Sequence, residues 1–279
     1  MFHFHFKPFA RSVAASQSDL GAYWARTSQD LIQALASRME GLTQKTARAK
    51  LRRLGVNALD VGLHYRSGLN RAEILSDPTA VADQVRALNI ATPNYYHQFG
   101  EGIAGQNLSL PGTITQNERD LDAVLRFADA ANIATVFILP GIVNPGQSRD
   151  QALAVATDSL RALLQVAQHH RARLCIEPHV QSWAESPALV HRLIDATGIG
   201  LALDYSHFAC LGYRQDEVDP LAHHALHVHL RQAKMGQLQA KFAQGTLNFP
   251  AMFATLRDAG YQGYLALESV HQDYMNTLT

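Results

Sequence analysis

Four short apolar segments in the second half of the chain each end in a side chain that can bind a metal ion. These segments end at Glu177, Asp204, His229 and Glu268. Side chains alternate between the two faces of a strand, so bulky aliphatic residues fill one face and the four candidate ligands lie on the other. If the segments are consecutive parallel strands of a closed barrel, the four side chains meet at its C-terminal end, where such barrels carry their active sites. We therefore predict one metal site built from these residues.

Three carboxylates and one imidazole form an oxygen-rich ligand set. Such a set favours Mn²⁺, Mg²⁺ or Co²⁺ and is also compatible with Zn²⁺. Four protein ligands leave two positions of an octahedral shell open for substrate oxygens. A cation held in this way polarises a carbonyl group and stabilises the oxygen of an enediolate. The alternative interpretation is that the acids cap helices or form salt bridges, and four aligned strand ends make it the weaker one.

Further polar side chains follow these strand ends and are candidates for substrate contact. His207 comes three residues after Asp204, where its imidazole could bond a substrate oxygen or act as an additional ligand. His179 and Glu185 lie in the segment after Glu177. Each of these side chains could instead belong to a helix start or a packed loop. We predict that His207 contacts the substrate and that His179 and Glu185 line the site.

The loops after the second and third predicted strands carry a second group of candidates. The first of these loops contains His64, and the second contains Tyr96 and His97. Loops at this end of a barrel select the substrate, and aromatic side chains there stack on sugar rings or exclude water. Packing within the loops is the alternative role for these three residues.

The elements that must position these residues alternate between strand-like and helix-like segments. The expected strands are the four segments that end at the candidate ligands and, before them, Phe2–Phe6, Asn57–Gly62, Asn89–Thr92 and Ala134–Leu139. The expected helices are Thr46–Leu54, Pro78–Leu88, Asn117–Ala131, Arg149–His170, Pro187–Ala196 and Pro250–Ala259. This order predicts an α/β fold, a (β/α)8 TIM barrel that forms a single domain over residues 1–279. A doubly wound sheet is the alternative, but no Gly-x-Gly-x-x-Gly turn follows an early strand.

The composition of the chain indicates which kinds of binding partner and which cellular compartment to expect. The 24 Lys and Arg residues balance 24 Asp and Glu residues, which disfavours a protein that neutralises nucleic-acid phosphates. The two cysteines, Cys175 and Cys210, form no CxxC pair, so a reduced cytoplasmic setting is expected. No apolar run approaches the roughly 18 residues that span a bilayer. We expect a small-molecule partner, no nucleic acid and no membrane.

The order of these motifs resembles the sugar phosphate isomerase/epimerase group of the xylose-isomerase-like barrels. The matching pieces are Ile176-Glu177-Pro178, Leu203-Asp204-Tyr205-Ser206-His207, His227-Val228-His229-Leu230-Arg231 and the segment Gly260–Tyr264 that leads to Glu268. From about Arg173 onward the resemblance includes specific motifs. Before Arg173 it is limited to the architecture of alternating strands and helices. It implies that the four candidate ligands bind the metal. The ketose 3-epimerase branch of the group implies in addition that the two glutamates exchange the proton and that His207 contacts the substrate. Arg231 is a further candidate for substrate binding.

Two departures separate the chain from the ketose 3-epimerase branch of that group. The branch has a glutamate six residues after the first metal glutamate and an arginine six residues after the metal histidine. Here these positions hold Trp183 and Met235. The resemblance therefore implies a metal-dependent isomerase or epimerase of a small sugar or keto-polyol, acting through an enediolate, without fixing the reaction.

Other functions fit parts of the pattern. A metal-dependent dehydratase of a keto-polyol uses the same enolate, and a non-catalytic sugar-binding barrel shares the fold. A DNA-repair endonuclease of this superfamily is disfavoured, because it needs an Asp-x-His pair shortly after His229. The segment Gln232–Phe249 contains neither residue type. A homo-oligomer is compatible with any of these readings.

Overall fold

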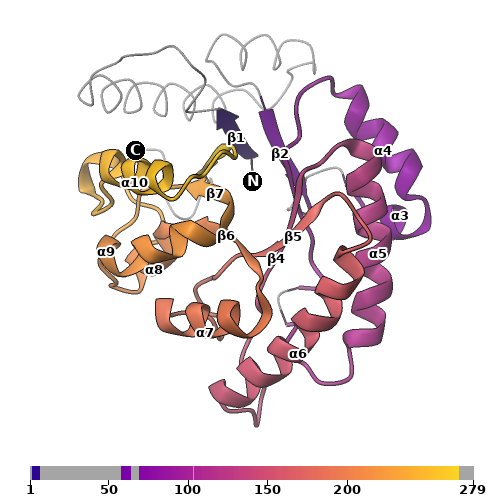
Figure 1. Ribbon diagram of the computed structural model, residues 1–279, viewed down its shortest axis with the longest axis horizontal. Helices are drawn as coiled ribbons and strands as arrows, with labels where there is room; N and C mark the ends of the chain where they lie inside the picture. Colours follow the sequence, from indigo (N-terminus) through magenta and orange to yellow (C-terminus); the bar gives the residue numbers. More distant parts are fainter. Residues whose placement is uncertain (1, 7–57, 64–68, 103, 270–279) are drawn as a thin grey trace.

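The strands of this chain close into one barrel, in the order of the sequence (Figure 1). The structure is a computed structural model, and it describes residues 2–6, 58–63, 69–102 and 104–269. The strands are β1 (Phe2–Phe6), β2 (Ala58–Gly62), β3 (Asn94–Tyr96), β4 (Thr135–Ile138), β5 (Arg173–Ile176), β6 (Gly200–Asp204), β7 (Ala225–Leu230) and β8 (Leu265–Ser269). From β2 to β8 each strand pairs in parallel with the next. This arrangement confirms the predicted TIM barrel.

Strand β1 differs from the regular pattern of a βα barrel. It pairs antiparallel with both β2 and β8, where the sequence suggested eight strands in one direction. An antiparallel strand still supplies hydrogen bonds to the two edges that would otherwise remain open, so the barrel closes.

Helices and short helical turns connect the strands and surround the barrel (Figure 1). They are α3 (Arg71–Ser76), α4 (Pro78–Ala87), α5 (Ile114–Ala131), α6 (Arg149–Ala167), α7 (Pro187–Thr197), α8 (Tyr205–Cys210), α9 (Gln215–Val218), η1 (Asp219–His224), η2 (Phe242–Gln244) and α10 (Phe249–Asp258). Their starts are encoded locally: Ser148 and Gln151 form a capping box on α6, and Ser186 caps α7. Among the described residues, no helix is long and apolar enough to cross a membrane.

The two faces of each strand pack into separate layers. The outward faces and the helices form the large apolar core, which includes Leu174, Leu203 and Val228. Inside the barrel a smaller cluster contains Tyr96, Phe137, Cys175 and Ala202. Cys175 and Ala202 each precede a candidate ligand by two residues, so the predicted alternation of faces holds at both strands.

The third strand was predicted in the wrong place. The sequence suggested Asn89–Thr92, but Asn89 has a positive φ of 48° and belongs to the turn after α4. Only Ala91 makes a bridge to β2 within that segment, and regular pairing begins after Pro93, at Asn94. The expected helix Thr46–Leu54 lies outside the described residues.

Candidate metal centre and active site

The C-terminal ends of β5 to β8 bring the four predicted ligands to one place. One ligand atom from each of Glu177, Asp204, His229 and Glu268 lies within 4.8 Å of those of the other three. All four side chains are buried. The β6–β7 register aligns Asp204 with His229, which explains why side chains so distant in the sequence converge.

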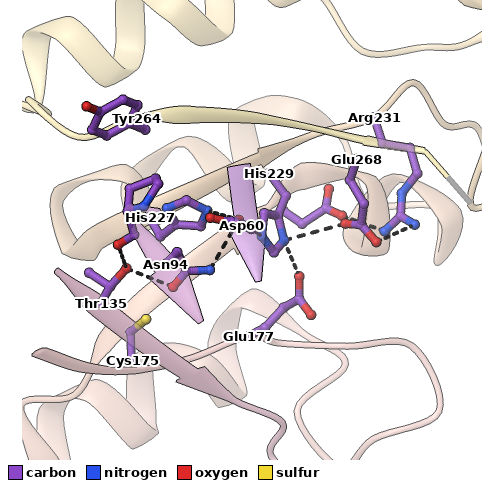
Figure 2. A network of polar contacts seen from close by, with 12 residues as sticks. Asp60, Asn94, Thr135, Cys175, Glu177, His227, His229, Arg231, Tyr264 and Glu268 are labelled. Carbon is purple, nitrogen blue, oxygen red and sulfur yellow. Dashed lines mark hydrogen bonds and ion pairs between the residues drawn. The ribbon is translucent and has the colours of Figure 1, made fainter. Parts of the chain in front are cut away.

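Positive groups lie directly against these carboxylates (Figure 2). The His229 Nδ1 atom is 2.6 Å from Glu177 Oε1 and 3.5 Å from Glu268 Oε2. Burial lowers the pKa of His229, but the carboxylates of Glu177, Asp60 and Glu268 together outweigh burial and hold the pKa well above its usual value. Arg231 donates to Asp204 Oδ2 at 2.6 Å and to Glu268 Oε1 at 3.1 Å. The cluster of acids thus attracts cationic groups from two sides.

The chemistry of this donor set fits a divalent cation. Burial raises the pKa of Asp204, since a carboxylate loses its hydration there, and Arg231 opposes that shift. Three acids this close and this deep need positive charge, which a protonated imidazole and a guanidinium supply in the metal-free protein. A divalent cation bound by the carboxylates and by His229 Nδ1 would supply the same charge.

A second polar layer lies beside the ligands, inside the barrel (Figure 2). Asp60 Oδ2, from β2, is 2.9 Å from His227 Nε2 and 3.7 Å from His229 Nε2. Asn94 donates to the same oxygen at 3.3 Å and accepts from Thr135 Oγ1 at 2.7 Å. Sequence reasoning missed Asp60. The available signal was an acid on the inward face of β2, opposite the His-x-His pattern of β7.

His207 and Arg231 lie beside the ligand cluster. His207 is buried at the start of α8, and burial lowers its pKa well below the usual value, so the ring is neutral. Its Nδ1 atom accepts a hydrogen bond from the Val180 amide at 3.2 Å. Arg231 donates from Nε to Ser206 Oγ at 3.0 Å. Both predicted residues therefore reach the site, and main-chain or side-chain contacts fix their orientation.

The segment after β5 contains the next two candidates, which have different surroundings. The rings of His179 and His207 lie 4.2 Å apart, centre to centre. Glu185 accepts from the Gln181 amide at 2.7 Å and pairs with Arg149 at 3.3 Å. Both carboxylate oxygens of Glu185 thus hold the loop in shape, whereas His179 reaches the cluster.

Tyr96, the last residue of β3, and His97, which follows it, point to opposite faces of the strand. The Tyr96 ring stacks on Phe137 with ring centres 4.9 Å apart, and Phe137 lies edge-on to His229 at 5.2 Å. The His97 ring instead lies edge-on to Phe99, at 4.8 Å, and burial lowers its pKa to about 3. The structure brings Tyr96 next to the ligand cluster and does not bring the His97 ring there. His64 lies outside the described residues.

A small pocket lies beside these residues. Its wall comes from the ends of β3 and β4 and the loops that follow, and it is formed by Tyr96, His97, Gln98, Phe99, Gly102, Asn107, Leu139 and Gly141. The Tyr96 hydroxyl donates to Gln98 at 3.2 Å. The wall is therefore polar in places but carries no Lys or Arg among the described residues.

Comparison with known proteins identifies the protein family of this barrel. Residues 47–277 match the xylose isomerase-like TIM barrel family. The chain belongs to this family. A curated relative, the 2-oxo-tetronate isomerase of Pectobacterium atrosepticum, is 26% identical over 175 residues. The matched part is 57% of this chain and 63% of the relative, so it spans less than two thirds of that protein.

Solved structures of similar fold include several sugar epimerases. L-ribulose 3-epimerase has a TM-score of 0.62 at 16% identity, covering 82% of this chain and 76% of that one. The 3-keto-D-glucoside 4-epimerase from E. coli has a TM-score of 0.58 at 16% identity, with coverage of 87% and 94%. The IOLI protein, solved with a binding zinc atom, has a TM-score of 0.63 at 14% identity, with coverage of 86% and 89%. At these identities the likeness establishes the xylose isomerase-like fold.

Two positions distinguish this xylose isomerase-like barrel from the ketose 3-epimerase pattern. Trp183 is fully buried and donates from its indole to Pro140 O at 2.7 Å. Met235 is 78% exposed. Neither side chain can replace the glutamate or the arginine of that pattern, because neither carries a charge.

Proposed function

We propose that this protein is a metal-dependent isomerase or epimerase of a small hydroxy-carbonyl compound, a sugar or keto-polyol. The observation that carries the proposal is the placement of two glutamates against one candidate metal site. Glu177 follows β5 and Glu268 lies in β8, so they come from well-separated parts of the barrel wall and meet at His229. A substrate between them would have an acid-base group on each side.

A divalent cation held by Glu177, Asp204, His229 and Glu268 would polarise the substrate carbonyl and acidify the neighbouring C–H bond. One glutamate then removes the proton from that carbon, and the other returns a proton to the enediolate. The neutral His207 ring donates from Nε2 to a substrate oxygen. Arg231 keeps Asp204 and Glu268 at a fixed separation and offsets part of their charge.

The substrate class follows from chemistry and from the relatives. A carbonyl next to a hydroxyl-bearing carbon is needed for an enediolate, and 2-oxo-tetronate, which names the Pectobacterium relative, has that arrangement. Epimerases of similar fold act on compounds with the same arrangement. We therefore propose 2-oxo-tetronate as the first substrate to examine, followed by ketoses.

The test combines metal removal with isotope exchange. Protein freed of metal by a chelator should lose activity, and Mn²⁺, Mg²⁺ or Co²⁺ should restore it. In heavy water, NMR should show deuterium at the carbon beside the carbonyl. Glu177→Gln and Glu268→Gln should each lower turnover by about 10²-fold or more, whereas Glu73→Gln, the same change on an exposed helix, should not. Full turnover by the metal-free protein, or by the double Gln variant, would exclude this mechanism.

A further inference from the structure

The main-chain amide and carbonyl of Val180 contact two histidines of the site and give them opposite proton positions. The Val180 amide donates to His207 Nδ1 at 3.2 Å, and the Val180 carbonyl oxygen is 2.6 Å from His179 Nδ1. An amide can only donate, so His207 Nδ1 has a lone pair and its proton is on Nε2. A carbonyl can only accept, so His179 Nδ1 carries the proton and its Nε2 has the lone pair.

Contacts along the loop hold the Val180 amide and the Val180 carbonyl in place. Gln181 has a positive φ of 68°, which a residue other than glycine adopts only when its surroundings enforce it. Its amide donates to Glu185, and the Ser182 hydroxyl donates to His179 O at 2.6 Å. The anchored indole of Trp183 follows directly. The orientations of the Val180 amide and of the Val180 carbonyl are therefore imposed by the loop and do not depend on the histidine rings.

Both rings face the same space next to a proposed acid-base residue. One ring nitrogen of His179, one of His207 and one Glu177 oxygen lie within 4.8 Å of one another. Arg231 approaches His207 Nε2 at 3.3 Å, but its NH2 group already donates to Asp204 at 2.6 Å. The guanidinium and the Val180 amide are both donors, and we assign the lone pair of His207 to Nδ1 because the Val180 amide is the closer of the two, so the second proton of that guanidinium nitrogen points away from the ring. His207 thus offers a donor, and His179 offers an acceptor.

Isomerisation and epimerisation need different numbers of proton transfers. Epimerisation removes the proton of one carbon and returns a proton to the other face of that carbon. Moving a carbonyl to its neighbour also transfers a hydrogen from carbon to carbon, and in addition one oxygen loses a proton while the other gains one. A residue that handles the oxygen-bound proton is therefore needed only by an isomerase.

We propose that His179 is a catalytic residue that carries this second proton, and that the site performs isomerisation. This inference rests on the proposed function. His179 Nε2 takes the proton from the substrate hydroxyl as that oxygen becomes a carbonyl, and it returns the proton to the former carbonyl oxygen. The glutamates move the carbon-bound hydrogen, and His207 Nε2–H bonds the oxygen on which negative charge develops. His179 ends in its starting state, and the two glutamates recover theirs by exchanging one proton with solvent, so no further reactant is needed.

The same geometry argues against a second cation at Glu177, His179 and His207. A metal needs a lone pair from each histidine, and the Val180 amide already occupies the lone pair of His207. Of the two rings, only that of His179 keeps an acceptor nitrogen to which no described residue donates. His179 is therefore arranged to carry a proton, and His207 beside it is arranged to donate a hydrogen bond.

His179→Asn tests the inference, because the asparagine amide can still donate to the Val180 carbonyl while the Nε2 base is removed. With 2-oxo-tetronate in heavy water, NMR follows deuterium entering recovered substrate and conversion to the isomer separately. The variant should keep exchange within about threefold of the wild type and lose about 10²-fold or more in conversion. His223→Asn, on an exposed turn, should change neither rate. Equal losses of exchange and conversion in His179→Asn, or unchanged conversion, would overturn the inference.

Nitrogen-15 NMR of the imidazole rings tests the proton positions without substrate. The spectra should show His179 protonated at Nδ1 and His207 protonated at Nε2. The same tautomer in both rings would overturn the inference, whatever the enzyme turns over. A wild-type protein that exchanges deuterium but yields only an epimer would also overturn it and would leave the proposed function intact. Wild-type protein that neither binds Mn²⁺ nor exchanges deuterium would instead contradict the proposed function, while the spectra still decide the tautomers.

Discussion

His229 meets carboxylates at both of its ring nitrogens, and each nitrogen has a different task. Nδ1 faces Glu177 and Glu268, so it is the atom that would bind a metal. The Nε2 atom of His229 lies 3.7 Å from Asp60 Oδ2. A carboxylate behind a metal-binding histidine keeps the proton on the distant nitrogen and orients the ring. Asp60 is therefore a positioning residue for the centre.

Replacing Asp60 should weaken metal binding without removing a ligand. Asp60→Asn keeps the size of the side chain but loses the charge that faces His229 and His227. We expect the affinity for Mn²⁺, measured by titration calorimetry, to fall about 10- to 100-fold. Asp158→Asn, on the exposed side of α6, serves as the control. Unchanged Mn²⁺ affinity with a lowered thermal stability of the metal-free protein would show that Asp60 only supports the fold.

Metal binding should also depend on pH through His229. Its pKa in the metal-free protein lies well above the usual value, so the ring is protonated at neutral pH. A metal at Nδ1 must displace that proton, and binding therefore becomes tighter as the pH rises toward the raised pKa. Calorimetry in two buffers of different ionisation enthalpy should detect release of about one proton per metal bound near neutral pH. Absence of proton release would exclude His229 as a ligand through Nδ1.

Among the elements, the loop after β7 is held by one side-chain amide. Gln232 accepts from the amides of Ala233 and Leu247 and donates to Leu247 O, all at 3.0 Å. Gly245 fits against this side chain because it lacks a Cβ: an added carbon would lie 2.1 Å from Gln232 Cδ. No local sequence pattern indicates that these two residues depend on each other.

This pairing predicts a compensating double substitution. Gly245→Ala should destabilise the fold through the clash, and Gln232→Ala should destabilise it by about 1 to 3 kcal/mol because the Leu247 groups lose their partner. The double variant should be less destabilised than the sum of the two, since the clash is then absent. Chemical denaturation measures all three. Strict additivity would mean that the clash is relieved elsewhere in the loop.

The elements also show which features local sequence can reveal. Helices α6 and α7 were predicted within a few residues, and the structure shows that Ser148 and Ser186 cap their starts. The inward alternation of β5 to β8 was also visible in the local sequence. Contacts between distant strands were not visible. Asp60 and His227 are separated by 167 positions, and the alternation of a strand does not reveal which residues lie across the barrel. The shifted third strand arose from a turn at Asn89 that resembled strand sequence.

For the whole molecule, all four candidate ligands come from the later half of the barrel, on β5 to β8. A bound metal would join the ends of these four strands and leave β2 to β4 without a direct bond to it. Hydrogen exchange followed by mass spectrometry should therefore show that Mn²⁺ slows exchange most in peptides covering β5 to β8 and the segment Pro178–Ser186. Uniform protection across the barrel would instead indicate that metal stabilises the fold as a unit.

The pocket beside Tyr96 belongs to the other half of the barrel, since its wall comes from residues 96–141 alone. Under the proposed function, the later strands would supply the reactive groups and the early loops would contact the substrate, so the two tasks would lie in separate stretches of the gene. A library confined to positions 98–107 and 139–147 would then change which substrate lengths are accepted and leave the affinity for Mn²⁺ unchanged.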